Sequence, residues 1–203
     1  MNGAAFDRLL TGPLGSDVLW ERSYLCPCTT AEGEASRRCP VCGGQGHVWD
    51  QAPPAFRIGV VSLNVRALAG IQQRFGPGVT GDATLSIPGC APCWQTVGEG
   101  DRFTVTSALA PVDWSLAAGR SIRLPVLAQD LQARVLDPDG KGFAVVVPPV
   151  PDDSGAIQVD VPTALTFLAP QRYEVVKELS KVRSFAPGLP RKVLVKLIDW
   201  TVR

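Results

Sequence analysis

Four cysteines lie close together near the start of the chain, at Cys26, Cys28, Cys39 and Cys42, in the pattern CPC-x10-CPVCGGQGH. Two closely spaced pairs, with prolines and glycines that favour tight turns, allow four thiolates to converge on one metal ion. Zinc is the expected ion, because a structural zinc site needs only a tetrahedral set of such ligands. An iron–sulfur cluster is the alternative, since four thiolates can also hold one.

Two further cysteines and the single histidine leave the full ligand set open. Cys90 and Cys93 form another CxxC pair, which could replace the first pair, form a disulfide or act as a redox dithiol. Redox catalysis is not expected, because Trp94 follows the pair instead of preceding it and no βαβ pattern surrounds it. His47 comes soon after the last cysteine of the cluster, and we expect a solvated histidine there and not a ligand.

The composition sets the broad class of the protein. The chain has 203 residues, of which 45% are hydrophobic, enough for one ordinary domain with appendages or for two small ones. With Gly 20 and Pro 18, the density of helix breakers disfavours long helices and favours short strands joined by turns. No apolar run approaches the roughly 18 residues that cross a bilayer, so no membrane partner is expected. The first residues lack the basic and apolar pattern of a secretory signal, which predicts a reducing cytosol. Thiols there bind metal more often than they form disulfides, although six cysteines could also pair as disulfides.

Residues with alternating or β-branched patterns predict a mainly β chain with a small β-barrel or sandwich. The expected strands are 57–65, 83–88, 101–106, 121–126, 131–136, 142–147, 156–161, 164–168, 172–176 and 192–202. Turns are expected at 98–101, 137–140 and 152–155, where glycine, proline and aspartate gather.

Short helices are expected at a few places only. Phe6, Leu9 and Leu10 share one helical face before Gly12-Pro13 ends the pattern, and a further helical turn is predicted over 16–22. A short helix is predicted over 65–75, whereas 173–183 fits a helix or a strand. Together these elements predict an N-terminal arm (1–22), a cysteine-rich metal-binding module (23–50) and a barrel or sandwich domain with loop excursions (55–203).

No set of residues for acid–base or nucleophilic catalysis is evident, so the protein is not expected to be an enzyme. The acidic pairs at 137–139 and 152–153 lack the ligand spacing of a calcium loop and are interpreted as turn residues. The formal net charge is +1, but basic residues outnumber acidic ones from Gln171 onward. That basic C-terminal segment could face DNA or an acidic partner, or could be a solvated strand face.

The cysteine pattern CPC…CPxCGGxGH, followed by strands and a GEGDRFTV strand entry, resembles neck proteins of tailed bacteriophages, the head–tail connector or head-closure class. By motif the resemblance covers 24–49 and 99–105. It implies a β-barrel with a long excursion, and it implies that Cys26, Cys28, Cys39 and Cys42 form a structural zinc knuckle. It also implies a virion protein, assembled in the host cytoplasm, whose copies form a homo-oligomeric ring between portal and tail, with DNA passing the channel.

Two other functions stay open from the sequence. One is a tail-tip or baseplate component with a zinc or iron–sulfur site. The other is a nucleic-acid-binding module that uses the zinc knuckle and the basic C-terminal segment.

Overall fold

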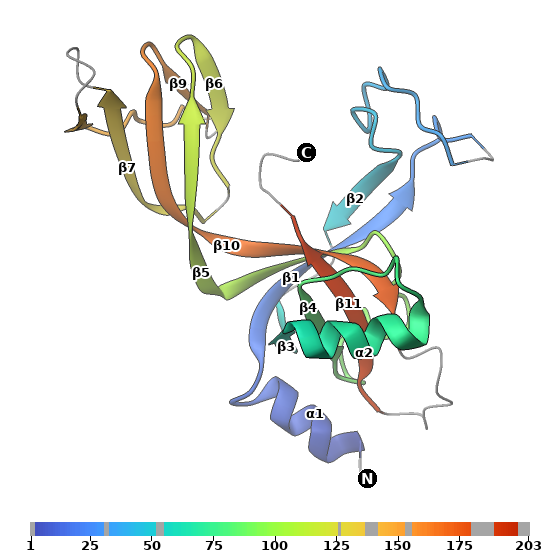
Figure 1. Cartoon of the computed structure of the whole chain (residues 1–203). Helices are drawn as coiled ribbons and strands as arrows, with labels where there is room; N and C mark the ends of the chain where they lie inside the picture. The colour runs from blue at the N-terminus through green and yellow to red at the C-terminus, as the bar shows by residue number, and fades with distance from the viewer. Residues whose placement is uncertain are drawn as a thin grey trace. The chain divides into compact units, whose positions relative to one another are not determined.

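The computed structural model describes residues 3–30, 33–51, 55–125, 127–136, 142–152, 156–179 and 189–198. Over these residues the chain is mainly β (Figure 1). The helices are α1 (Gly3–Thr11) and α2 (Val65–Phe75). The strands are β1 (Ser16–Leu25), β2 (His47–Gln51), β3 (Phe56–Ser62), β4 (Ala83–Ile87), β5 (Arg102–Leu116), β6 (Arg120–Arg123), β7 (Gln129–Leu136), β8 (Phe143–Val146), β9 (Ala156–Val159), β10 (Thr163–Glu178) and β11 (Arg191–Leu197).

The contacts divide the chain into two compact units. The first unit comprises Met1–Ser107 and Arg172–Arg203, and the second comprises Ala108–Gln171. This division follows the long strands β5 and β10, each of which contributes one part to each unit. It differs from the expected segments 1–22, 23–50 and 55–203, because strands that are distant in the sequence pair with one another.

The first unit is a closed β-barrel, as the sequence predicted. Its strands follow the order β11-β4-β3-β1-β5-β10, and the pairing of β10 with β11 closes the circle. Alternation places apolar side chains inside, as in β4, where Ala83, Leu85 and Ile87 are buried and the residues between them are half-buried. Val18 of β1 and Phe103 of β5 are fully buried in the same core.

The helical turn expected at 16–22 is wrong, because these residues belong to β1. Val18 and Trp20 are buried in the barrel core, whereas Leu19 between them is 38% exposed. This alternation has the period of a strand, and β1 pairs with β5 on one side and with β3 on the other. Burial of one face of the strand therefore outweighs the short helical pattern in determining the local conformation.

Both short helices occur where the sequence predicted them. In α1 only Leu10 is buried, and the helix contacts β3. The α2 helix begins after Asn64, whose side chain accepts a hydrogen bond from Ala67 N at 2.8 Å. No helix among the described residues is long and apolar enough to cross a membrane.

Several boundaries differ from the expected ones. The ambiguous stretch 173–183 is strand as far as Glu178, and 164–168 and 172–176 merge into the single strand β10. β5 continues well beyond 106, and β2 was not predicted. Some expected features lie outside the described residues: the turn at 137–140, residues 153–155 of the turn at 152–155, residues 180–188 of the C-terminal segment, and the end of the last strand from 199.

The second unit has its own small core. Ile157 of β9 and Leu165 of β10 are fully buried there. The Trp114 and Phe167 rings meet edge to face, with centroids 4.7 Å apart. β6 and β9 form a two-stranded sheet, and β7 pairs with β10 on one side and with β8 on the other.

Candidate metal centre

The four cysteines of the N-terminal cluster converge on one point in the structure. The sulfurs of Cys26, Cys28, Cys39 and Cys42 all lie within 4.8 Å of one another. Cys26 Sγ lies 3.8 Å from Cys39 Sγ, and Cys28 Sγ lies 3.4 Å from Cys42 Sγ. These separations are far longer than a disulfide bond of about 2.05 Å, and all four thiols are free.

The sulfur positions fit a single tetrahedral ion. Four thiolates at about 2.3 Å from one centre are about 3.8 Å apart, which follows from tetrahedral geometry. The Cys26–Cys39 and Cys28–Cys42 separations lie close to this value, and all the sulfurs lie within 4.8 Å of one another. The site supplies four thiol ligands, so that a four-coordinate ion bound there keeps no open position for a substrate. This is the arrangement of a structural site and not of a catalytic one.

Backbone hydrogen bonds hold the two cysteine pairs against each other. Cys26 N donates to Gly46 O at 2.8 Å, which joins the first pair to the end of the second turn. Gly43 N donates to Cys39 O at 2.9 Å and closes the CPVC turn. Gly46 N also donates to Cys42 Sγ at 3.4 Å. The loop therefore has an ordered backbone frame that aims its sulfurs inward.

The thiols of the cluster differ in their acidity. Burial opposes ionisation of Cys42, but hydrogen bonds from the backbone of Gly46 and Gly44 outweigh it and hold its pKa at about 6, below the usual value of 9.0. Burial and the hydrogen bond with Cys42 raise the pKa of Cys28 to about 12. Without a cation to balance their charge, the Cys42 thiol therefore loses its proton at a lower pH than the Cys28 thiol does.

The remaining candidate ligands lie apart from this sulfur group. His47 begins β2, and its Nδ1 lies 2.8 Å from Ser23 Oγ, so the imidazole bridges the two strands instead of joining the cluster. Cys93 is fully buried in the barrel core, and burial raises the pKa of its thiol to about 12. Cys90 is exposed. Among the described residues, the metal-binding group contains neither cysteine of this third pair.

The loop is carried by two paired strands. β1 leads into it and β2 leads out, with Glu21 opposite Gln51 and Leu25 opposite His47 (Figure 1). The same β1 is a barrel strand at its other end. The metal loop is therefore the tip of an extension of the barrel wall.

A buried carboxylate anchors the base of this extension. Asp101 accepts hydrogen bonds from Trp20 Nε1 at 3.0 Å, from Ser23 N at 2.8 Å and from Gly98 N at 3.1 Å. Burial raises the pKa of this carboxyl above its usual value of 3.8, although the three hydrogen bonds act in the opposite direction. Asp101 thus joins β1, just before the cysteines, to the turn that precedes β5. Sequence reasoning treated Asp101 only as a turn and strand-entry residue and missed this role.

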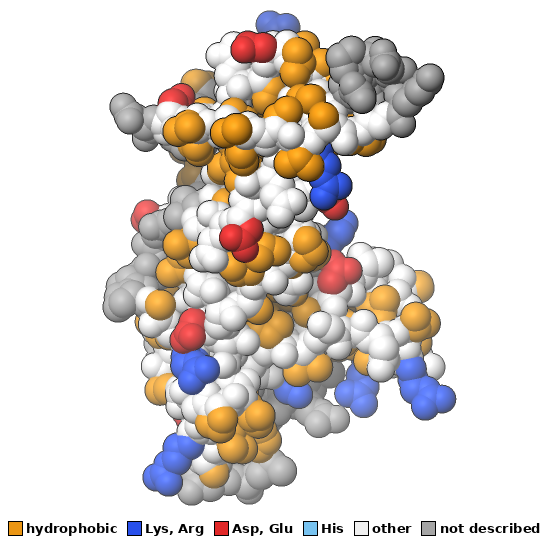
Figure 2. Space-filling view, turned by 90° about the vertical axis from the view of Figure 1, so that its left-hand side faces the viewer, with side chains coloured by type: hydrophobic (Ala, Val, Ile, Leu, Met, Phe, Trp, Pro, Cys, Tyr) orange, Lys and Arg blue, Asp and Glu red, His pale blue; other side chains and the backbone are white. Residues whose placement is uncertain are grey.

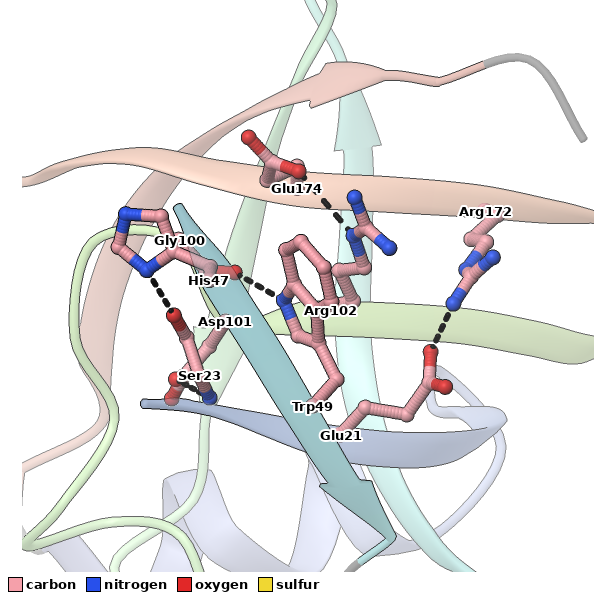
Figure 3. Close-up of polar contacts among 9 residues, drawn as sticks. All are labelled: Glu21, Ser23, His47, Trp49, Gly100, Asp101, Arg102, Arg172 and Glu174. Atoms are coloured by element: carbon pink, nitrogen blue, oxygen red, sulfur yellow. Dashed lines mark hydrogen bonds and ion pairs between the residues drawn. The ribbon is translucent and has the colours of Figure 1, made fainter. Parts of the chain in front are cut away.

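On the other strand of the extension, Trp49 contacts β5 and the turn that precedes β5 (Figure 3). Its Nε1 donates to Gly100 O at 2.8 Å, and the guanidinium carbon of Arg102 lies 3.3 Å from the centre of its ring. Arg102 Nε in turn donates to Glu174 Oε2 of β10 at 3.1 Å. Nothing in the spacing of these residues along the sequence indicated that they meet.

The basic C-terminal segment is partly neutralised in the structure. Figure 3 shows the ion pair between Arg172 and Glu21, in which Nη2 of Arg172 lies 2.6 Å from Oε2 of Glu21. Arg191 pairs with Glu178, and the exposed Lys177 lies 3.5 Å from Glu99. These ion pairs use cations that a nucleic-acid surface would present to phosphates.

A cavity of about 620 Å³ lies elsewhere in the first unit, where α1 and α2 flank the barrel. Apolar side chains such as Phe6, Ile71 and Phe75 line it, with Arg74 and Lys192 as its charged residues. The described lining contains no aspartate, glutamate, histidine or cysteine. Of the residue types that commonly act as general acid or base, the described lining contains Lys192.

No protein-family model matches this chain, and no curated protein sequence matches it either. Its function must therefore be inferred from the sulfur site, the barrel and the surfaces of the described residues.

Proposed function

We propose that the protein is a non-catalytic structural subunit of a tailed bacteriophage virion, a neck or head–tail connector protein whose copies form a ring between portal and tail. The sulfur site is the observation that carries this proposal. Four thiols within 4.8 Å of one another, on a loop carried by an extension of a closed barrel, suit a structural metal site and not a reaction centre.

The proposed ion is zinc, held by Cys26, Cys28, Cys39 and Cys42. Its chemistry there is to neutralise the thiolates and to fix a loop that is too small to build a core of its own. The short sulfur–sulfur separations favour a single ion, because a cluster of several irons and sulfides would push the thiolates farther apart. A colourless preparation that contains zinc agrees with this assignment, whereas visible absorbance would favour iron.

The barrel and its stapled extension suit an assembly subunit. A subunit of a ring needs a rigid body and projecting parts that reach its neighbours. Here the closed barrel supplies the body, and the β1–β2 extension supplies a projecting part whose tip carries the exposed Leu25 and Val41. Exposed apolar side chains on a fixed loop are suited to contact with another protein.

Co-expression with the portal and tail proteins of the proposed phage tests the proposal. We expect ring-shaped complexes that contain the chain, seen by electron microscopy, and their loss when Cys39→Ser and Cys42→Ser are combined. A matched Cys90→Ser variant should assemble normally, because the exposed Cys90 lies outside the sulfur group. A zinc-loaded protein that stays free of both portal and tail would contradict the proposal. Tight DNA binding that weakens steeply with salt would instead favour the nucleic-acid-binding alternative.

A further inference from the structure

β8 is the last strand of its sheet in the described part of the chain. It pairs on one side with β7 in antiparallel register, with Val146 opposite Ala133 and Phe143 opposite Leu136. No described strand pairs with its other side. An edge of this kind presents unpaired backbone donors and acceptors that another strand can complete.

The side chains of this edge strand are apolar and exposed. Phe143 and Val145 are 65% and 76% exposed, and they lie on one face because strand residues alternate. Val147, the next residue of the same parity, is 89% exposed. In Figure 2, hydrophobic side chains gather over the second unit with few charged side chains among them.

The edge lacks the charged residues with which edge strands normally resist pairing. Residues 142–150 read GFAVVVPPV and contain no charge. By contrast, β6 in the same unit carries Arg120 and Arg123. Pro148 and Pro149 have no backbone N–H, so a strand that pairs with this edge ends at Val147.

We propose that β8 pairs with β8 of a second copy of this chain, antiparallel and around a two-fold axis at Val145. In this register Val145 faces Val145 of the other copy, and Phe143 faces Val147. A neutral, apolar edge is matched by an equally neutral strand, whereas a charged strand such as β6 would lose hydration without gaining an ion pair. The strand itself is self-complementary, since the residues of its exposed face are apolar on both sides of Val145.

This contact is separate from the one that closes a ring. A two-fold contact uses the same surface on both copies, whereas a ring needs two different surfaces. The inference therefore goes beyond the proposed function. It is tested on the pure protein without any phage component, so that its failure is distinguishable from a failure of ring assembly.

Sedimentation equilibrium of the purified chain, with Val145→Lys and Val65→Lys as variants, tests the contact. Val65 is a matched control, because it is 87% exposed and lies on α2. We expect a monomer–dimer equilibrium for the natural chain and the control. For Val145→Lys we expect a dissociation constant at least about tenfold larger, because two lysines would oppose each other in the dimer. Because Val145 is exposed, both variants should keep the far-UV spectrum of the natural chain. A natural chain that is monomeric at about 0.5 mM, where a useful contact would be populated, contradicts the proposal, as does equal dimerisation of all three proteins.

Cross-linking tests the register. In a Cys90→Ser background, which removes an exposed thiol, Val145→Cys should give a covalent dimer on mild oxidation, because directly opposed residues have Cβ atoms about 4.5–5.5 Å apart. Val150→Cys is the control, since Val150 is at least as exposed as Val145 but follows the two prolines. Equal cross-linking of both cysteines, or cross-linking of neither, contradicts the two-fold register.

Discussion

The guanidinium carbon of Arg102 lies 3.3 Å from the centre of the Trp49 ring, and this contact joins the barrel to the strand that leaves the cysteine loop. Arg102 belongs to β5 and Trp49 to β2. The cation over the ring is nearly inaccessible, with a side chain 4% exposed, so that water does not weaken the attraction. The metal loop and the barrel wall are therefore linked by stacking as well as by strand pairing.

Replacing Arg102 by leucine should weaken the fold. The variant loses the stacked cation and the hydrogen bond to Glu174, so we expect a loss of about 1–3 kcal/mol in the free energy of unfolding. Urea unfolding followed by circular dichroism measures the loss. Lys177→Ala is the matched control, because the Lys177–Glu99 pair is exposed and such pairs contribute little. Equal stability of Arg102→Leu and the natural chain would show that the stacking is incidental.

Gly100→Ala should also be destabilising. Gly100 has a φ of +86°, and a Cβ atom there would lie 2.9 Å from Ser23 Oγ. Gly33 has a similar φ of +85° with nothing within 4 Å of its Cβ position, so Gly33→Ala measures the backbone strain alone. We expect Gly100→Ala to cost about 1–2 kcal/mol more than Gly33→Ala in thermal or urea unfolding. Equal costs would mean that Ser23 moves away freely.

The Asp101 carboxyl should make stability depend on pH in a defined direction. Burial raises its pKa above the usual 3.8, so the folded chain holds a proton over a pH range in which the unfolded chain has released it. This contribution to the free energy of unfolding is complete below about pH 4. It is lost as the pH rises through the raised pKa of the folded chain. The difference in unfolding free energy between the natural chain and Asp101→Asn should therefore fall with rising pH in this range.

Carbon-detected NMR titration of the Asp101 carboxyl gives the direct measurement. We expect a midpoint above 3.8 in the folded chain. A midpoint at or below that value would mean that the hydrogen bonds from Trp20, Ser23 and Gly98 outweigh burial.

Local patterns in the sequence were sufficient for much of the barrel. The alternation in 83–88 and 101–106 predicted β4 and the start of β5, because one face of each strand is buried. The cysteine spacing predicted the sulfur cluster for a similar reason, since both pairs lie on one short loop. The metal itself stays a prediction.

Features that depend on distant partners were not predictable in the same way. Residues 16–22 carry a weak helical pattern, but pairing with β5 and burial of Val18 make them a strand. Trp49 and Arg102 are far apart in the sequence and meet only because β2 extends β1 beside the barrel. No single-sequence pattern specifies such a pairing.

Metal analysis combined with thiol counting tests the central claim most directly. Native mass spectrometry and elemental analysis of the purified chain should find one zinc ion per chain. A thiol reagent should then modify the exposed Cys90 readily and the four cluster cysteines only after chelation, whereas the combined Cys39→Ser and Cys42→Ser variant should contain no zinc. A folded natural chain that binds no metal under zinc-replete conditions, with Cys26, Cys28, Cys39 and Cys42 reacting as fast as Cys90, would contradict the account.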